Sequence, residues 1–113
     1  MSAIYNFEVN QFSTFNASLL LKDDAGVTRD LSTYIAKMQV RYRSRGGSLI
    51  FTLSMDDGIT IDENTNIIYI TISSDRTAML KDDVFYDIVL INNDDTIERI
   101  LEGQLIINEG VTR

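Results

Sequence analysis

Apolar and polar residues alternate along most of the chain, and this two-residue period constrains the fold more than any other feature. The clearest run is AKMQVRYR, residues 36–43, where apolar and polar positions strictly alternate. Successive side chains of a strand point to opposite faces of a sheet, so this run predicts a half-buried strand. Similar runs predict further strands over residues 5–9, 14–22, 48–53, 66–73, 85–91, 96–101 and 103–108.

Short segments rich in Gly, Asn and Asp separate these runs. They are DDAG, RSRGG, DDG, DENTN and NNDD, and these residue types tolerate the backbone angles of tight turns. Gly103 separates the last two runs and predicts a bulge or kink. The only helical candidate is Ser73–Leu80, which Ser73, Ser74 or Asp75 could cap.

Regularly spaced short strands favour an all-β fold, an antiparallel β-sandwich of seven to nine strands with at most one short helix. A length of 113 residues suits one domain, residues 1–113. The alternation also predicts the buried core. Its expected members are Leu19, Leu21, Met38, Val40, Phe51, Ile70, Ile72, Tyr86, Ile88, Leu90 and Leu105.

The composition removes several classes of chemistry. The chain has no Cys and no His, so disulfides, thiolate metal sites and histidine-based catalysis are excluded. Its net charge of −7 argues against general binding to a nucleic-acid backbone. No segment has the composition of a signal peptide or the length of a membrane span. We expect no cofactor, no nucleic acid, no membrane and no small-molecule substrate as partners.

No pattern typical of an enzyme is present. The sequence has no nucleophile elbow of the GxSxG type and no glycine-rich loop that would hold phosphate. Its carboxylates show no spacing that singles out two of them as an acid–base pair. We therefore expect the protein not to be an enzyme.

Four adjacent aspartate pairs lie at predicted element boundaries. A calcium site is one interpretation, because paired carboxylates suit a hard cation. Turn formation is the other and the favoured one, because Asp is a common turn residue. The metal prediction is therefore none, with a weak cation site left open. The pairs are Asp23–Asp24, Asp56–Asp57, Asp82–Asp83 and Asp94–Asp95.

A basic stretch over residues 37–45 is the strongest candidate interface. It holds Lys37, Arg41, Arg43 and Arg45, four of the ten basic residues of the chain. The first three alternate and so share one strand face. This face could simply be solvated, or could meet an acidic patch on another subunit. For such a patch, the Asp94 and Asp95 turn of a neighbouring copy is the candidate acidic surface. Nucleic acid is a third interpretation, with Tyr42 as a stacking platform, although Tyr42 points to the opposite face of a regular strand.

The segments LLLKDDAGVTRDLS, MQVRYR, YDIVL and LEGQLIINEGVTR together resemble small immunoglobulin-like β-sandwich domains of tailed bacteriophages, such as the N-terminal domain of the phage baseplate upper protein. The resemblance covers about residues 5–113 and rests most on Gly103, Val111–Arg113 and Tyr86–Ile88. It transfers no catalytic residue.

This resemblance implies a bacteriophage virion structural protein, a component of the tail, baseplate, neck or fibre attachment that acts through protein–protein interfaces. Its partners would be other virion proteins and copies of itself in a symmetric assembly, and its location would be the virion after assembly in the host cytoplasm. The alternatives are a capsid decoration protein and a module that binds a host receptor or glycan.

Overall fold

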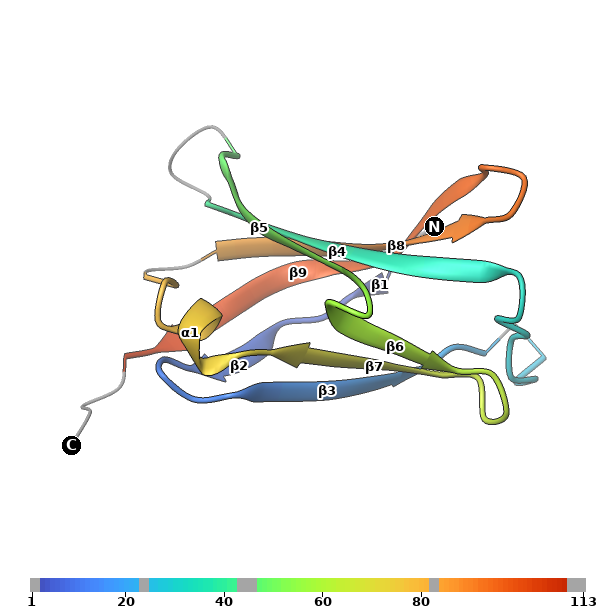
Figure 1. Ribbon diagram of the computed structural model, residues 1–113, viewed down its shortest axis with the longest axis horizontal. Coiled ribbons are helices and arrows are strands. Elements are labelled where there is room, and N and C mark those ends of the chain that lie inside the picture. The colour runs from blue at the N-terminus through green and yellow to red at the C-terminus, as the bar shows by residue number, and fades with distance from the viewer. Residues whose placement is uncertain (1–2, 23–24, 43–46, 82–83, 110–113) are drawn as a thin grey trace.

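The protein is nearly all β-structure. A computed structural model describes residues 3–22, 25–42, 47–81 and 84–109. These residues form nine strands and one short helix, α1 (Figure 1). In chain order the elements are β1 Ala3–Ile4, β2 Phe7–Asn10, β3 Phe15–Leu20, β4 Tyr34–Tyr42, β5 Leu49–Met55, β6 Gly58–Asp62, β7 Ile67–Ile72, α1 Ser74–Thr77, β8 Val84–Asn92 and β9 Ile97–Asn108.

The strands form two layers of one curled, half-barrel sheet (Figure 1). The order is β1-β9-β8-β4-β5-β6-β7-β3, with β2 also pairing β9. We call the layer from β1 and β2 to β5 the first layer, and β6, β7 and β3 the second. Strand β5 pairs with β4 and then with β6, so it joins the layers at one side.

The predicted all-β class with at most one short helix is confirmed among the described residues, but the expectation of a purely antiparallel sheet is wrong. Strands β1 and β2 run parallel to β9, and β5 runs parallel to β6. The second parallel pair arises because the chain crosses from one layer to the next through the tight Ser54–Asp57 turn, whose backbone groups bond reciprocally. Alternation reports which face is buried and carries no information on strand direction.

The interior between the layers is apolar and follows the predicted alternation. Of the eleven residues predicted to form the core, eight are buried, and Leu19, Leu21 and Phe51 are half-buried against the same cluster. The half-buried leucines belong to the edge of the second layer, where β3 pairs only with β7 among the described strands. An edge strand has a neighbour on one side only, so its inward side chains stay partly open to solvent.

The predicted turns are confirmed by backbone geometry. A residue with positive φ lies in each predicted turn segment, at Gly26, Gly47, Asp56, Gly58, Asn66 and Asp95. The helical prediction is also confirmed: the Ser73 hydroxyl accepts a hydrogen bond from the Arg76 amide at 3.3 Å and caps α1. Phe12 also has positive φ, at the β2–β3 corner, where no turn was predicted.

The bulge predicted at Gly103 lies elsewhere. Strand β9 runs unbroken through Gly103, which pairs with Tyr86. The register instead shifts between Ile88 and Val89, so that Ile100 is the extra residue of β9. Ile100 and Leu101 are consecutive and both buried, which a regular strand does not allow. Gly103 instead allows the backbone between β1 and β2 to approach β9 closely.

Candidate protein interface

The outer face of the first layer carries its side chains in cross-strand rows over β4, β8 and β9. Pairing between the strands sets four successive rows from the β8–β9 turn inward. The first, which we call the isoleucine row, is Ile35, Ile91 and Ile97; the second, the basic row, is Lys37, Val89 and Arg99. The third row is Gln39, Asp87 and Glu102, and the fourth is Arg41, Phe85 and Gln104.

The isoleucine row is an apolar strip on a solvent-facing surface. Ile35 is 45% exposed and Ile97 is 66% exposed, while Ile91 between them is half-buried. Directly opposite residues in an antiparallel pair lie in side-chain contact range. Isolated exposed apolar residues are ordinary, but adjacent ones in one row form a continuous apolar surface of the kind that marks interaction sites.

Lys37 and Arg41 share the outer face, as predicted, but their surroundings differ. Lys37 is exposed in the basic row. Arg41 is half-buried, and its guanidinium donates to the Gly47 carbonyl at 2.9 Å and to the Gln39 side-chain oxygen at 2.6 Å. Arg41 therefore holds the neighbouring β5 end in place. Arg43 and Arg45 lie outside the described residues.

The Asp94–Asp95 turn, which we call the acidic turn, joins β8 to β9 beside the isoleucine row. The Asp94 carboxylate accepts the Thr96 amide at 3.0 Å, and bonds to Thr96 lower the pKa of this exposed carboxyl. Asp95 adopts φ 70° and donates its amide to the Asn92 carbonyl at 2.9 Å. The turn is thus locally ordered and carries two exposed aspartates. In Figure 1 the tip of this hairpin bends away from the second layer.

Opposite charges therefore border the isoleucine row on its two sides. The acidic turn lies at one side and the basic row at the other. Arg99 contacts Asp87 in the third row through a long ion pair of 3.5 Å and stays 55% exposed. Along the strands, the acidic turn is followed by the apolar isoleucine row, then the basic row, and then the third row with its two acidic residues.

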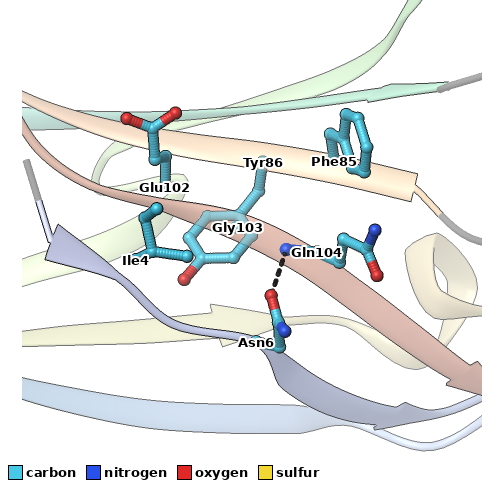
Figure 2. Close-up of a pocket in the computed structure, with 7 residues that line it drawn as sticks. All are labelled: Ile4, Asn6, Phe85, Tyr86, Glu102, Gly103 and Gln104. Atoms are coloured by element: carbon cyan, nitrogen blue, oxygen red, sulfur yellow. Dashed lines mark hydrogen bonds between the residues drawn. The ribbon is translucent and has the colours of Figure 1, made fainter.

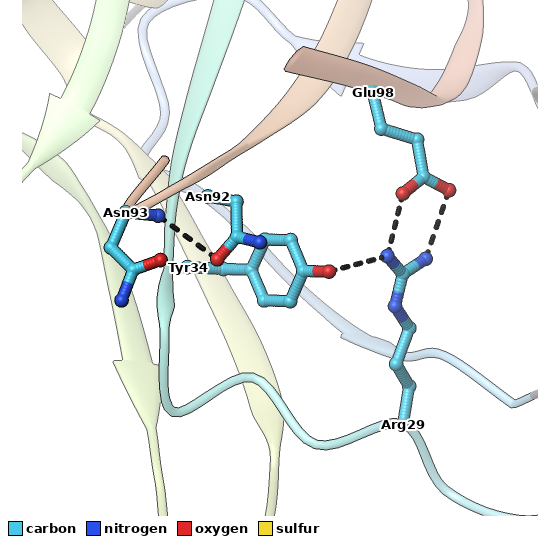
Figure 3. Close-up of polar contacts among 5 residues, drawn as sticks. All are labelled: Arg29, Tyr34, Asn92, Asn93 and Glu98. Atoms are coloured by element: carbon cyan, nitrogen blue, oxygen red, sulfur yellow. Dashed lines mark hydrogen bonds and ion pairs between the residues drawn. The ribbon is translucent and has the colours of Figure 1, made fainter. Parts of the chain in front are cut away.

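A polar cluster anchors the loop before β4 at the same end of the molecule (Figure 3). The Arg29 guanidinium makes two bonds to the Glu98 carboxylate, at 2.9 and 2.5 Å, and one to the Tyr34 hydroxyl at 3.2 Å. Arg29 lowers the pKa of Glu98, and Glu98 in turn raises the pKa of Arg29. The two-point geometry is the favourable one for an arginine and a carboxylate, so it fixes the loop against β9.

At the opposite end of the first layer, a hollow of about 380 Å³ lies around Gly103 (Figure 2). A Cβ on Gly103 would lie 2.0 Å from the Tyr5 carbonyl oxygen, so only glycine lets the chain between β1 and β2 cross here. The Tyr86 hydroxyl donates to the same oxygen at 2.5 Å, and the Asn6 side chain accepts the Gln104 amide at 2.9 Å. These contacts fasten the N-terminal segment to β9.

A second hollow, of about 480 Å³, lies between α1 and the β5–β6 turn. Asp57 there pairs with Arg76 at 3.2 Å, which is the contact expected of a turn held to a helix. Asp23–Asp24 and Asp82–Asp83 lie outside the described residues. Within the described ranges, no three acidic side chains gather as they would around a metal ion. No described helix is long and apolar enough to cross a membrane.

Sequence reasoning missed the isoleucine row and Arg99 as interface residues, although the signal was present. Ile35 alternates with Lys37, and Ile97 alternates with Arg99, so each isoleucine had to share a face with a basic residue. The positions of β8 and β9 beside β4 were needed to bring the three isoleucines together.

No family model matches the chain, and no curated protein matches its sequence.

Proposed function

We propose that the protein is a structural component of a bacteriophage virion and acts through the outer face of its first layer. The resemblance to immunoglobulin-like phage domains supports the virion part of the proposal. The immunoglobulin-like relationship is itself part of what we propose. The tail, baseplate, neck or fibre attachment are the locations that the resemblance favours. The partners are other virion proteins and copies of the same chain.

The observation that carries the proposed mode of action is the isoleucine row between charges of opposite sign. A contact surface needs apolar side chains at its centre and charges at its rim that select the partner. The described face supplies both, in the acidic turn, the isoleucine row and the basic row. The Gly103 end uses its polar groups on its own chain, through Tyr86 and Asn6.

Mass spectrometry of gradient-purified particles tests the virion role. The chain should be recovered in fixed, repeated stoichiometry to the major virion proteins, and its loss from purified particles would contradict the proposal. Lys37→Glu should reduce incorporation while the chain stays folded, and Lys22→Glu, an exposed lysine outside the described strands, is the matched control. Binding of the purified chain to host glycans without incorporation would instead support the receptor-binding alternative.

A further inference from the structure

We propose that the outer face of the first layer is a self-complementary surface that binds a second copy of this chain about a two-fold axis along the isoleucine row. This inference deepens the proposed function by naming a partner for the same face, and it rests on that face being the working surface. It concerns the isolated chain in solution, so it can fail or hold separately from the virion role.

The order of the rows carries the inference. A two-fold axis lying along the isoleucine row between two facing copies reverses the strand direction of one copy relative to the other. Each feature on one side of the row then meets the feature from the other side. The acidic turn of each copy faces the basic row of its partner, and the isoleucine rows face each other.

Opposite charges face each other in this two-fold arrangement, but not when the strands of the two copies run in the same direction. Asp94 and Asp95, between β8 and β9 of one copy, meet the basic row of the other at Arg99, with Lys37 on β4 in the same row, and symmetry makes the same contact twice. Stacking the two faces with their strands in the same direction would instead place the acidic turn on the acidic turn. Like charges in opposition disfavour that register, so charge selects the two-fold arrangement.

The acidic turn is placed to reach a partner. The tip of the β8–β9 hairpin bends to the outer side of the first layer, away from the second layer (Figure 1). The Asp94–Thr96 bond and the Asn92–Asp95 bond hold its shape, so little ordering is required on binding. The Arg29–Glu98 cluster fixes the β3–β4 loop against the start of β9 (Figure 3).

The apolar contribution comes from a few side chains, so the isolated dimer should be weak. Exposed apolar area is concentrated on Ile35 and Ile97, at 45% and 66%. Contacts with so few apolar side chains at their centre belong to the weak or transient class of interfaces. Repetition in an array would strengthen such a contact without any new interaction, because the second binding event becomes intramolecular.

Sedimentation equilibrium over a wide range of protein concentration tests the inference with the full chain. The parent should shift from monomer to dimer as concentration rises. Ile97→Ser should weaken dimerisation at least about tenfold, as expected for an apolar residue at the centre of a contact. Tyr69→Ser removes an exposed aromatic from the second layer and should leave dimerisation unchanged. Ile35→Ser is a second variant of the row should the first misfold.

A charge exchange tests the two-fold arrangement itself. Lys37→Glu alone and Asp95→Lys alone should each weaken self-association about tenfold, because each homodimer then contains two repulsive contacts. An equimolar mixture of the two variants should recover association to within about threefold of the parent, because both contacts of the mixed dimer join opposite charges.

Three outcomes would overturn the inference. The parent could stay monomeric at every concentration, dimerisation could survive Ile97→Ser and Ile35→Ser alike, or the mixture could associate no better than its components. A parent that dimerises as described but is missing from particles would refute the virion role and leave the dimer standing. Incorporation into particles of a parent that stays monomeric in solution would support the virion role and refute the dimer.

Discussion

The two ends of the first layer are built from the same strands but use their side chains differently. At the Gly103 end, the buried Tyr86 and the side chain of Asn6 hydrogen-bond to their own chain and fasten the segment between β1 and β2 to β9. At the hairpin end, Ile35 and Ile97 remain exposed beside charges. Alternation alone therefore does not distinguish a structural end of the layer from a binding end. What distinguishes them is whether the side chains at that end bond within their own chain.

The largest effect on stability should come from Gly103→Ala. The new Cβ would meet the Tyr5 carbonyl oxygen at 2.0 Å, and that atom belongs to the backbone and cannot rotate away. We expect a loss of about 3 kcal/mol in the free energy of unfolding, as for severe overpacking. Urea denaturation measures it.

Gly26→Ala is the control for the glycine experiment. Gly26 has φ 82°, and a Cβ there would meet nothing within 4 Å. Its cost should be limited to backbone strain of about 1 kcal/mol. Equal losses for the two variants would show that the close approach at Gly103 is not the constraint.

Tyr86→Phe should have the next largest effect. It removes the hydroxyl that donates to the Tyr5 carbonyl, and the expected loss is about 1–2 kcal/mol. Burial raises the pKa of Tyr86 above its ordinary value of 10.0. A raised folded-state pKa means that the contribution is full below the ordinary pKa and is lost as the pH rises above it. Denaturation at neutral and strongly alkaline pH should show a smaller difference between parent and variant at alkaline pH.

Glu98→Gln should have a smaller effect because the ion pair is partly solvated. We expect a loss of at most about 1 kcal/mol at neutral pH. Arg29 lowers the folded-state pKa of Glu98 below its ordinary value of 4.5. The contribution is therefore present above that ordinary value and is lost as the pH falls through the folded-state pKa. The difference in melting temperature between parent and variant should shrink on acidification, and a difference that stays constant would contradict the ion pair's contribution.

Ile97→Ser should change the stability of the monomer least. Its side chain is 66% exposed, and surface substitutions commonly change the free energy of unfolding by less than about 0.5 kcal/mol. Denaturation at low protein concentration measures this. A loss of more than about 2 kcal/mol would place Ile97 among the core residues and remove it from the interface.

Local chemistry predicted the parts of the fold that depend on neighbouring residues. The turns at Asn66 and Asp95, the Ser73 cap and most core positions follow from residue types and their period. Strand direction did not follow, because β1 and β2 reach β9 from the far end of the chain. Strand β6 was missed because it is short and lies between two turn segments.

The candidate interface was predictable only in part, for the same reason. Alternation placed Lys37 and Arg41 on one face. The structure shows in addition that Arg41 bonds to its own chain, whereas Lys37 is exposed. The isoleucine row depends on the pairing of β4, β8 and β9. Gly103 was singled out for a bulge, but its role comes from Tyr5, ninety-eight residues earlier in the chain.

The hairpin end of the outer face should bind a second copy, and the Gly103 end should not. Methyl NMR of isoleucine-labelled protein at increasing concentration separates the two ends, because isoleucines lie at both. The δ-methyl signals of Ile35, Ile91 and Ile97 should shift together with concentration, while that of Ile4, 77% exposed at the Gly103 end, should stay constant. Concentration-dependent shifts at Ile4 with unchanged signals from the isoleucine row would contradict self-association through the hairpin end.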